Sequence, residues 1–137
     1  MDGVIILYAL SIFFIELWIK NFLKNYPFLN FPLINVVFNK GIAFGLFKEY
    51  DPFLIYLIIS FFFLVLYFIT RANQLLFSSK MAYGFIIGGA SSNLFDRLVY
   101  GYVIDYIDIK VWPIFNLADA AITTGVAILI LNSFRSR

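Results

Sequence analysis

Residues 54–69 read LIYLIISFFFLVLYFI, an apolar run that carries no charged side chain. A helix needs about 20 consecutive, mostly apolar residues to cross the hydrocarbon core of a bilayer. With its apolar neighbours, this run has close to that length. The stretch therefore predicts a membrane helix over about residues 53–69, with a packing role and a lipid-facing surface.

Three other stretches share this length and composition, at about residues 4–22, 81–98 and 117–134. Hydrophobic residues make up 63% of the 137 residues and charged residues only 13%, which excludes an ordinary soluble domain. The third helical stretch is rich in glycine, which lets helices approach closely, so we expect it inside the bundle. The sequence predicts a mainly α-helical membrane protein, with four transmembrane helices in a single domain over residues 1–137.

Two long connections separate the helices, at about residues 24–52 and 100–116. The β-favouring run LINVVF and the glycine-punctuated NKGIAFG (39–45) predict short strands and a turn in the first connection. In the second, apolar and polar residues alternate over residues 107–112 as in a strand. With four spans, both connections lie on one side of the membrane, where they predict a small β-structure.

The charge distribution favours termini in the cytoplasm. Arg71, Lys80, Arg135 and Arg137 are concentrated on the terminal side of the predicted bundle, whereas the basic residues of the long connections are spread over many more positions. Because cytoplasmic loops carry an excess of Lys and Arg, the long connections are expected to be extracytoplasmic.

Two aspartates beside the apolar segments, Asp105 and Asp119, are the candidate catalytic residues. An ionised carboxylate at the centre of a membrane helix costs about 2.5–3.5 kcal/mol, so retained ones indicate a function. The chain has no histidine and no cysteine, which excludes imidazole and thiolate chemistry and disulfides. Two carboxylates could instead share a proton, with one activating a water against a peptide carbonyl and the other protonating it.

The surroundings of the two aspartates predict different pKa values. Asp105 stands among apolar residues in GYVIDYIDI, where desolvation is expected to raise its pKa. Asp119 stands in the first turn of a predicted helix, where the positive end of the dipole favours the charged form. Asp108 is a rival for the role of Asp105, although its place in the alternating pattern predicts a solvated face.

Further polar residues could brace such a site. Asn93, Asp96 and Arg97 stand at i, i+3 and i+4 and share one helix face. Asp96 beside a guanidinium is expected to stay ionised and to act as a structural anchor. Asn116 and Asp119 are spaced like the N-cap and N3 residues of the fourth helix, so capping alone could explain Asn116.

Asn39 in NKGIAFG allows two interpretations. Beside Gly41 it could be only a turn residue, or its amide could bind the peptide backbone of a substrate. Gly41 and Gly45 permit hinge motion, which suggests the hypothesis that this segment is a lid.

Glu16 and Lys20 stand four apart on the first helix, the favourable order for an intrahelical ion pair. We expect an interfacial pair in which Lys20 extends to the lipid headgroups. The alternative is a catalytic lysine that activates the hydroxyl of Ser91 or Ser92, although no local feature indicates a sufficiently desolvated lysine.

Other classes of function fit the same acids. A small transporter could use Asp105, Asp119 and Asp96 as a proton or cation path, and a scaffold subunit could use polar residues only to hold helices together. The net charge of +2 is too small to indicate binding of nucleic acid. No metal or other cofactor is implied, because histidine and cysteine are absent and the few acids already have roles.

Three motifs follow one another along the chain: NKGIAFG, GGASSNLFDRLVYGYVIDYIDI and FNLADAAITTG. In this order they resemble the motifs of the lipoprotein signal peptidases, also called signal peptidase II. The resemblance covers nearly the whole chain. It implies an aspartyl endopeptidase of the bacterial inner membrane that removes the signal peptide from prolipoproteins, just before a diacylglyceryl-modified cysteine.

The resemblance also implies roles for particular residues. Asp105 and Asp119 match the catalytic pair. The residues that match site-lining or bracing positions are Asn39, Asn93, Asp96, Arg97 and Asn116. Two residues depart from the family's usual pattern, since Glu16 replaces Asp and Tyr106 replaces Phe.

The remaining implications concern the setting of the enzyme. The resemblance implies a four-helix bundle with a small periplasmic β-structure, cytoplasmic termini and an active site near the outer face of the membrane. The expected partners are a lipid-modified prolipoprotein and membrane lipid, and the protein is expected to be a monomer.

Overall fold

The computed structural model describes residues 2–26, 31–40, 52–71 and 75–135. Most of NKGIAFG, including Gly41 and Gly45, lies outside these residues. The hypothesis that this segment is a lid therefore stays a prediction.

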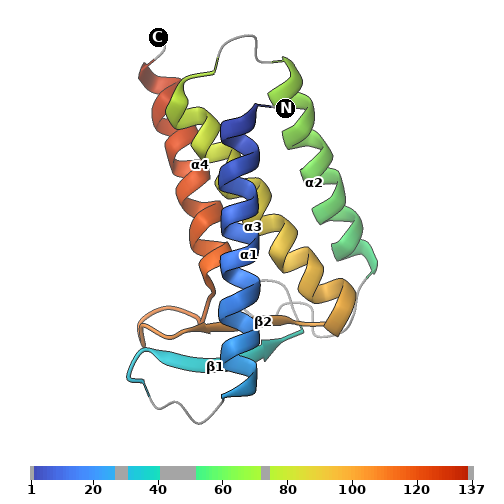
Figure 1. The fold of residues 1–137 in the computed structure, drawn as a ribbon, viewed down its shortest axis with the longest axis vertical. Helices are drawn as coiled ribbons and strands as arrows, with labels where there is room; N and C mark the ends of the chain where they lie inside the picture. The colour runs from blue at the N-terminus through green and yellow to red at the C-terminus, as the bar shows by residue number, and fades with distance from the viewer. Residues whose placement is uncertain (1, 27–30, 41–51, 72–74, 136–137) are drawn as a thin grey trace.

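Four helices and a two-stranded sheet make up the described part of the chain. The helices are α1 (Gly3–Asn25), α2 (Pro52–Arg71), α3 (Phe77–Tyr100) and α4 (Leu117–Arg135). Figure 1 shows them as a bundle, with the sheet at one end and the two chain ends at the other. The mainly helical fold is confirmed, and the strands of both long connections lie at the same end of the bundle.

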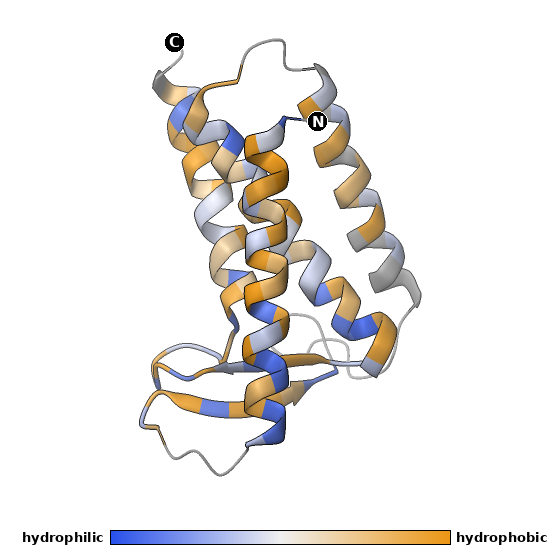
Figure 2. Cartoon of the chain, viewed as in Figure 1, coloured by the Kyte–Doolittle hydropathy of each residue, from blue (hydrophilic) through white to orange (hydrophobic). Residues whose placement is uncertain are grey.

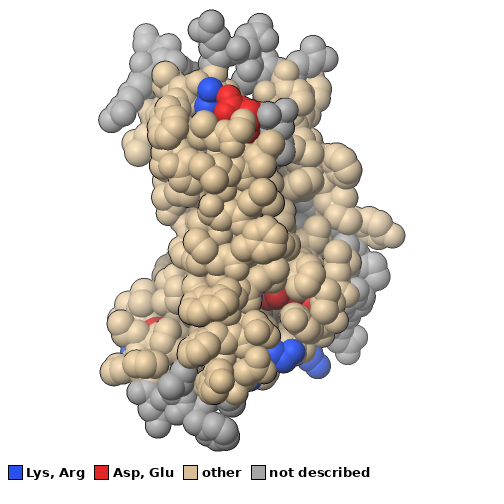
Figure 3. All heavy atoms as spheres, in the orientation of Figure 1, with Lys and Arg blue, Asp and Glu red and all other residues tan. Residues whose placement is uncertain are grey.

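Apolar residues cover much of the helical bundle. Within the described residues, two helices, Gly3–Asn25 and Leu117–Phe134, are long and apolar enough to cross a membrane. Figure 2 shows hydrophobic residues along all four helices, and in Figure 3 the charged side chains of the visible face gather toward its two ends. Such a distribution suits a bundle whose middle is surrounded by hydrocarbon. For α2 and α3, the crossing of a membrane stays a prediction.

α3 is the central helix and packs against both α1 and α4. A Cβ added at Gly88 would lie 2.5 Å from the carbonyl oxygen of Ala9 in α1, and one at Gly89 would lie 2.5 Å from that of Ala118 in α4. Glycine therefore lets the backbones of both neighbours come close to α3. The predicted interior position of this helix is confirmed.

α3 begins at Phe77, earlier than the predicted boundary at residue 81. The hydroxyls of Ser78 and Ser79 each accept a hydrogen bond from Asn132 Nδ2 of α4 at 2.9 Å. Lys80 Nζ lies 2.7 Å from Asp2 Oδ2, at the N-cap of α1. These polar contacts hold the first turn of α3 in place, which the apolar pattern alone could not predict.

The sheet pairs β1 (Ile34–Asn39) with β2 (Val103–Ile107) in antiparallel fashion. The strand predicted from LINVVF is confirmed. In this register Asn39 lies opposite Val103, two residues from Asp105. Residues in this diagonal relation share one face of a sheet and lie within reach of long side chains. The pairing thus brings the end of β1 to the strand of the candidate acid.

The alternating pattern over residues 107–112 does not form a strand, so that prediction is wrong. β2 ends at Ile107. Asp108 Oδ1 accepts a hydrogen bond from the backbone N–H of Lys110 at 2.9 Å, and Lys110 has a φ of 66°. A short acidic side chain that binds its own backbone two residues on forms a turn and ends the strand.

The loop between β2 and α4 is closed by two backbone hydrogen bonds between Ile107 and Phe115. The N–H of Phe115 donates to the carbonyl oxygen of Ile107 at 3.1 Å, and the carbonyl oxygen of Phe115 accepts from the N–H of Ile107 at 2.7 Å. The loop therefore closes just before α4 begins. As a result, Asn116 and Asp119 lie beside the strand that carries Asp105.

Candidate active site

The carboxylate of Asp105 lies at the sheet end of the bundle and is held by two amides. The residue is only 4% exposed. Asn39 Nδ2 donates to Asp105 Oδ2 at 2.9 Å, and Asn116 Nδ2 donates to Asp105 Oδ1 at 2.8 Å. Asn39 is therefore more than a turn residue, because its amide contacts the candidate acid directly.

Asp119 lies in the first turn of α4. The N–H of Asp119 donates to Asn116 Oδ1 at 2.9 Å, and the N–H of Asn116 donates to Asp119 Oδ2 at 3.3 Å. This reciprocal pair is a capping box, which confirms the predicted N-cap and N3 spacing. Asn93 of α3 donates from Nδ2 to Asp119 Oδ1 at 2.8 Å, so the carboxylate is also tied to the central helix.

Two asparagine side chains join the aspartates into one network. Asn116 Nδ2 donates to Asn93 Oδ1 at 3.0 Å. A chain of amides therefore runs from Asp105 through Asn116 and Asn93 to Asp119. Capping of α4 uses only the side-chain oxygen of Asn116. Its side-chain amide donates instead to Asn93 and Asp105, which capping does not explain. We call these four residues the dyad network.

Burial raises the pKa of Asp105 to about 6. Desolvation is the largest cause, and the nearby charge of Asp119 acts in the same direction, whereas hydrogen bonds from Asn39 and Asn116 oppose it. The increase predicted from the apolar neighbours of Asp105 is confirmed. A carboxyl group with a pKa near the working pH is suited to donate a proton in catalysis.

A buried ammonium group lies beside the dyad network, so the prediction that Lys20 extends to the lipid headgroups is wrong. Lys20 is 2% exposed and Glu16 is 0% exposed. Lys20 Nζ lies 3.3 Å from Glu16 Oε1 and 2.8 Å from Asp96 Oδ2, and it donates to Asn93 Oδ1 at 3.1 Å. Buried charges require partners, and two carboxylates and an amide supply them here. The ion pair of Glu16 with Lys20 exists, but inside the protein.

The surroundings of Lys20 do not favour the Ser–Lys alternative. Ser92 Oγ accepts from Nζ at 3.4 Å, while Ser91 lines a cavity on another face of α3. A lysine base must offer a free lone pair to the hydroxyl, whereas this amine nitrogen donates to its neighbours.

Asp96 forms its ion pair with Lys20, at 2.8 Å, whereas the sequence predicts a partnership with Arg97. Asp96 is 1% exposed, and its Oδ2 also accepts from the backbone N–H of Ile104 at 3.1 Å, which fixes β2 against α3. Arg97 Nη1 donates to the carbonyl oxygen of Asn93 at 3.2 Å. Asp96 therefore contacts the backbone of β2, and Arg97 contacts the backbone of its own helix.

The predicted solvated face for Asp108 is wrong as well. The residue is 7% exposed, and Oδ2 accepts from Lys110 Nζ at 2.7 Å and from Asn35 Nδ2 at 3.2 Å. The hydrogen bonds from Lys110 and Asn35 lower the pKa of Asp108. These partners belong to the turn and to β1, and not to the dyad network, so Asp108 is a turn residue and a weak rival of Asp105.

The sequence alone predicts no role for Tyr106. Its hydroxyl donates to Glu16 Oε2 at 2.7 Å and accepts from the backbone N–H of Leu117 at 3.2 Å. The one feature that could have indicated a role is its hydroxyl, which stands in an apolar strand at a position where the resemblance implies Phe. The contact with Glu16 could not be predicted without the packing of α1 against β2.

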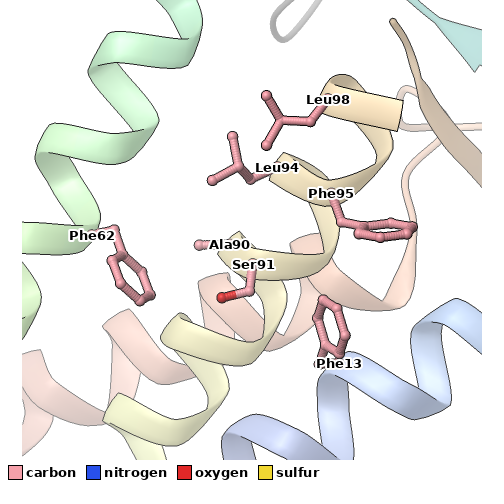
Figure 4. A pocket seen from close by; sticks show the side chains of 7 residues that line it. All are labelled: Phe13, Phe62, Ala90, Ser91, Leu94, Phe95 and Leu98. Atoms are coloured by element: carbon pink, nitrogen blue, oxygen red, sulfur yellow. The ribbon is translucent and has the colours of Figure 1, made fainter. Parts of the chain in front are cut away.

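A cavity of about 250 Å³ lies between α1, α2 and α3 (Figure 4). Its lining is almost entirely apolar: Phe13, Phe62, Ala90, Ser91, Leu94, Phe95 and Leu98. With about 3.6 residues per turn, Ala90, Leu94 and Leu98 lie on a different side of α3 from Asp96, and Asn93 lies between the two sides. Among the described residues, no group of three or more His, Cys, Asp or Glu side chains could hold a metal ion.

The fold is shared with bacterial membrane enzymes. Two solved structures that are described in these words match this chain at 25% identity, with TM-scores of 0.88 and 0.86. The first match covers 98% of this chain and 90% of the other, and the second covers 100% and 96%.

The family can be stated more closely. The family described as signal peptidase (SPase) II matches residues 4–135. Lipoprotein signal peptidases of Wigglesworthia glossinidia brevipalpis and Aquifex aeolicus are 40% and 38% identical, over 92% of this chain in each case and over 91% and 83% of their own lengths. The chain belongs to the signal peptidase II family, and the resemblance of its motifs is confirmed.

Proposed function

We propose that this protein removes the signal peptide from diacylglyceryl-modified prolipoproteins, cutting before the lipidated cysteine, with Asp105 and Asp119 as the catalytic pair. Membership of the signal peptidase II family supports the reaction and the substrate class. The observation that carries the residue assignment is the dyad network. In it the side chain of Asn116 binds Asp105, the side chain of Asn93 binds Asp119, and the two asparagines bind each other. These acids gather at one end of the bundle, which favours hydrolysis over a transport path along the helices.

The two carboxyl groups divide the proton transfers of peptide hydrolysis. Asp119 takes a proton from a water molecule whose oxygen attacks the scissile carbonyl carbon. Asp105, whose pKa is raised to about 6, gives its proton to the carbonyl oxygen. The C–N bond then breaks as the proton held by Asp119 moves to the leaving nitrogen, and the proton on the diol returns to Asp105. The pair ends with the single proton it began with.

We infer that α1 to α4 all cross the bacterial inner membrane. The sheet end and the dyad network then lie near the outer face, and the termini lie in the cytoplasm, as the concentration of basic residues on the terminal side suggests. The protein acts as a monomer. Asn39, Asn93, Asp96, Arg97 and Asn116 line or brace the site.

The apolar cavity beside α3 is the place that we assign to an acyl chain of the substrate. Leu94 lines it, and Leu94 is adjacent in the chain to Asn93 of the dyad network. Each methylene that leaves water for such surroundings contributes about 0.8 kcal/mol. Lipid bound there would hold the modified cysteine close to the acids.

The function is tested with the purified protein in detergent and two precursors of one sequence, with and without the diacylglyceryl group. We expect cleavage of the lipidated precursor alone, and a product whose first residue is the lipidated cysteine. Mass spectrometry of both fragments identifies the cut. Equal cleavage of the unmodified precursor would contradict the substrate class, and no cleavage of either would contradict the function.

Replacing Asn39 by Ala is expected to move the basic limb of the pH profile of kcat/KM to higher pH. The hydrogen bond from Asn39 lowers the pKa of Asp105, so its removal raises that pKa above about 6. Activity needs the shared proton and is lost as the pH rises through this pKa. In the variant the loss therefore occurs at higher pH. Asn35→Ala, which removes a partner of Asp108 on the same strand, serves as the control. A basic limb that stays at the wild-type pH or moves to lower pH would contradict the assignment of Asp105 as the proton donor.

A further inference from the structure

Tyr106 follows Asp105 on β2, so its side chain points to the opposite face of the strand. There it is buried at 4% exposure and meets two groups from distant parts of the chain. The hydroxyl hydrogen is donated to Glu16 Oε2 at 2.7 Å, and the hydroxyl oxygen accepts from the backbone N–H of Leu117 at 3.2 Å. A phenol has one hydrogen to donate, and here Glu16 takes it.

The second contact concerns the beginning of α4. The first N–H groups of a helix have no partner within it, and Leu117 is the first residue of α4. Asn116 Oδ1 serves the N–H of Asp119, and the hydroxyl of Tyr106 serves that of Leu117. Glu16 also accepts a hydrogen bond from the backbone N–H of Ala118. These side chains therefore set the position of the turn that carries Asp119.

Glu16 orients the hydroxyl of Tyr106 and is itself held in place. Its Oε1 lies 3.3 Å from Lys20 Nζ, and Lys20 donates to Asn93 Oδ1 at 3.1 Å. Asn93 in turn binds Asp119. With its hydrogen fixed on Glu16, the hydroxyl presents a lone pair to the N–H of Leu117.

The contact between Glu16 and Tyr106 depends on the length of one side chain and the hydroxyl of the other. Aspartate at position 16 is one methylene shorter than Glu16, and phenylalanine at position 106 has no hydroxyl. Neither replacement alone could make the hydrogen bond seen here. Glu16 and Tyr106 form a matched pair.

We propose that Tyr106 is a positioning residue for the catalytic pair, because its hydroxyl, oriented by Glu16, ties the strand of Asp105 to the first turn of the helix of Asp119. The inference rests on the proposed function, since it concerns the distance and orientation of the two carboxylates. Tyr106 itself transfers no proton. Burial raises its pKa far above the usual range, so it remains a neutral donor.

The test compares Tyr106→Phe, Glu16→Asp and the double variant, each with the lipidated precursor in detergent. We expect kcat to fall about tenfold in either single variant, the size expected for a lost buried hydrogen bond, with KM changed less than about twofold. Because both changes break the same hydrogen bond, the double variant is expected to lose about tenfold rather than about a hundredfold. Tyr8→Phe, whose ring packs edge-on against Phe85 in the bundle, serves as the matched control with unchanged kcat.

The outcomes separate this inference from the proposed function. If wild type cleaves and Tyr106→Phe keeps the wild-type kcat, the positioning role fails while the function stands. Losses that multiply in the double variant would also overturn it, because the two residues would act independently. Should Tyr106→Phe fail to fold, the kcat of Glu16→Asp tests the positioning role by itself. This variant keeps the negative charge and shortens the side chain by one methylene. A wild type without activity would overturn both proposals.

Discussion

An Asp105→Asn variant is expected to insert and fold like wild type and to cleave the lipidated precursor about a thousandfold more slowly or worse. Loss of a positioned general acid or base removes about 10²–10⁴-fold of rate, and the two acids act as one unit. Asparagine keeps the size of the side chain and an oxygen that can accept from Asn39 or Asn116. The change therefore removes the proton donor with little change in packing. The measurement is kcat/KM in detergent.

The control for this variant is Asp108→Asn, three residues further along the chain. Asp108 accepts hydrogen bonds in a turn from Lys110 and Asn35, outside the dyad network. It should keep activity within about threefold of wild type, a change that corresponds to less than 1 kcal/mol. Full activity in Asp105→Asn, or an equal loss in both variants, would contradict the assignment of Asp105.

Lys20→Met is expected to lower the free energy of unfolding by about 3–5 kcal/mol, which is the cost of removing one partner from a buried ion pair. Glu16 and Asp96, both at most 1% exposed, would lose their cation, and Asn93 would lose a donor. Thermal unfolding in detergent measures the loss. Activity should fall as well, because Asn93 binds Asp119.

Two further variants give this prediction its controls. Lys24→Met, one turn along α1, removes an exposed lysine whose Nζ lies 4.1 Å from the ring centroid of Tyr100, and it should cost less than about 1 kcal/mol. The triple variant Glu16→Gln, Lys20→Met, Asp96→Asn removes all three charges together and should recover most of the stability. A triple variant as unstable as Lys20→Met would show that the cost does not come from unpaired charge.

Much of this fold could be predicted from the long apolar runs of the sequence. Long apolar runs must become helices in hydrocarbon, since each backbone polar group needs a partner there. The four helices therefore follow from composition. The polar first turn of α3 could not be predicted in this way, because Ser78 and Ser79 are helical through a contact with Asn132 of α4.

Local chemistry explains which parts of the site were predicted. The raised pKa of Asp105 follows from its apolar neighbours along the chain, and the capping box of Asn116 and Asp119 follows from their spacing. Both effects act over a few residues. The contact of Asn39 with Asp105 depends instead on the register of β1 against β2, which spacing along the chain does not fix.

Lys20 and Asp108 show where local patterns mislead. Lysine near the end of a membrane helix commonly extends to the interface, but here two acids from α1 and α3 make an interior position possible for Lys20. The alternation around Asp108 is that of a strand, but its own side chain binds the N–H of Lys110 and turns the chain. In both cases a specific polar contact outweighs the pattern.

The need for both aspartates is tested most directly by the single-turnover rate at which Asp119→Asn cleaves the lipidated precursor. Asparagine can still accept a hydrogen bond from Asn93 or from the N–H of Asn116, so the start of α4 should remain in place and only the carboxylate is lost. We expect no cleavage above the background without enzyme, together with a thermal unfolding temperature near that of wild type. Cleavage at the wild-type rate would contradict this expectation, because peptide hydrolysis would then not require the pair Asp105 and Asp119.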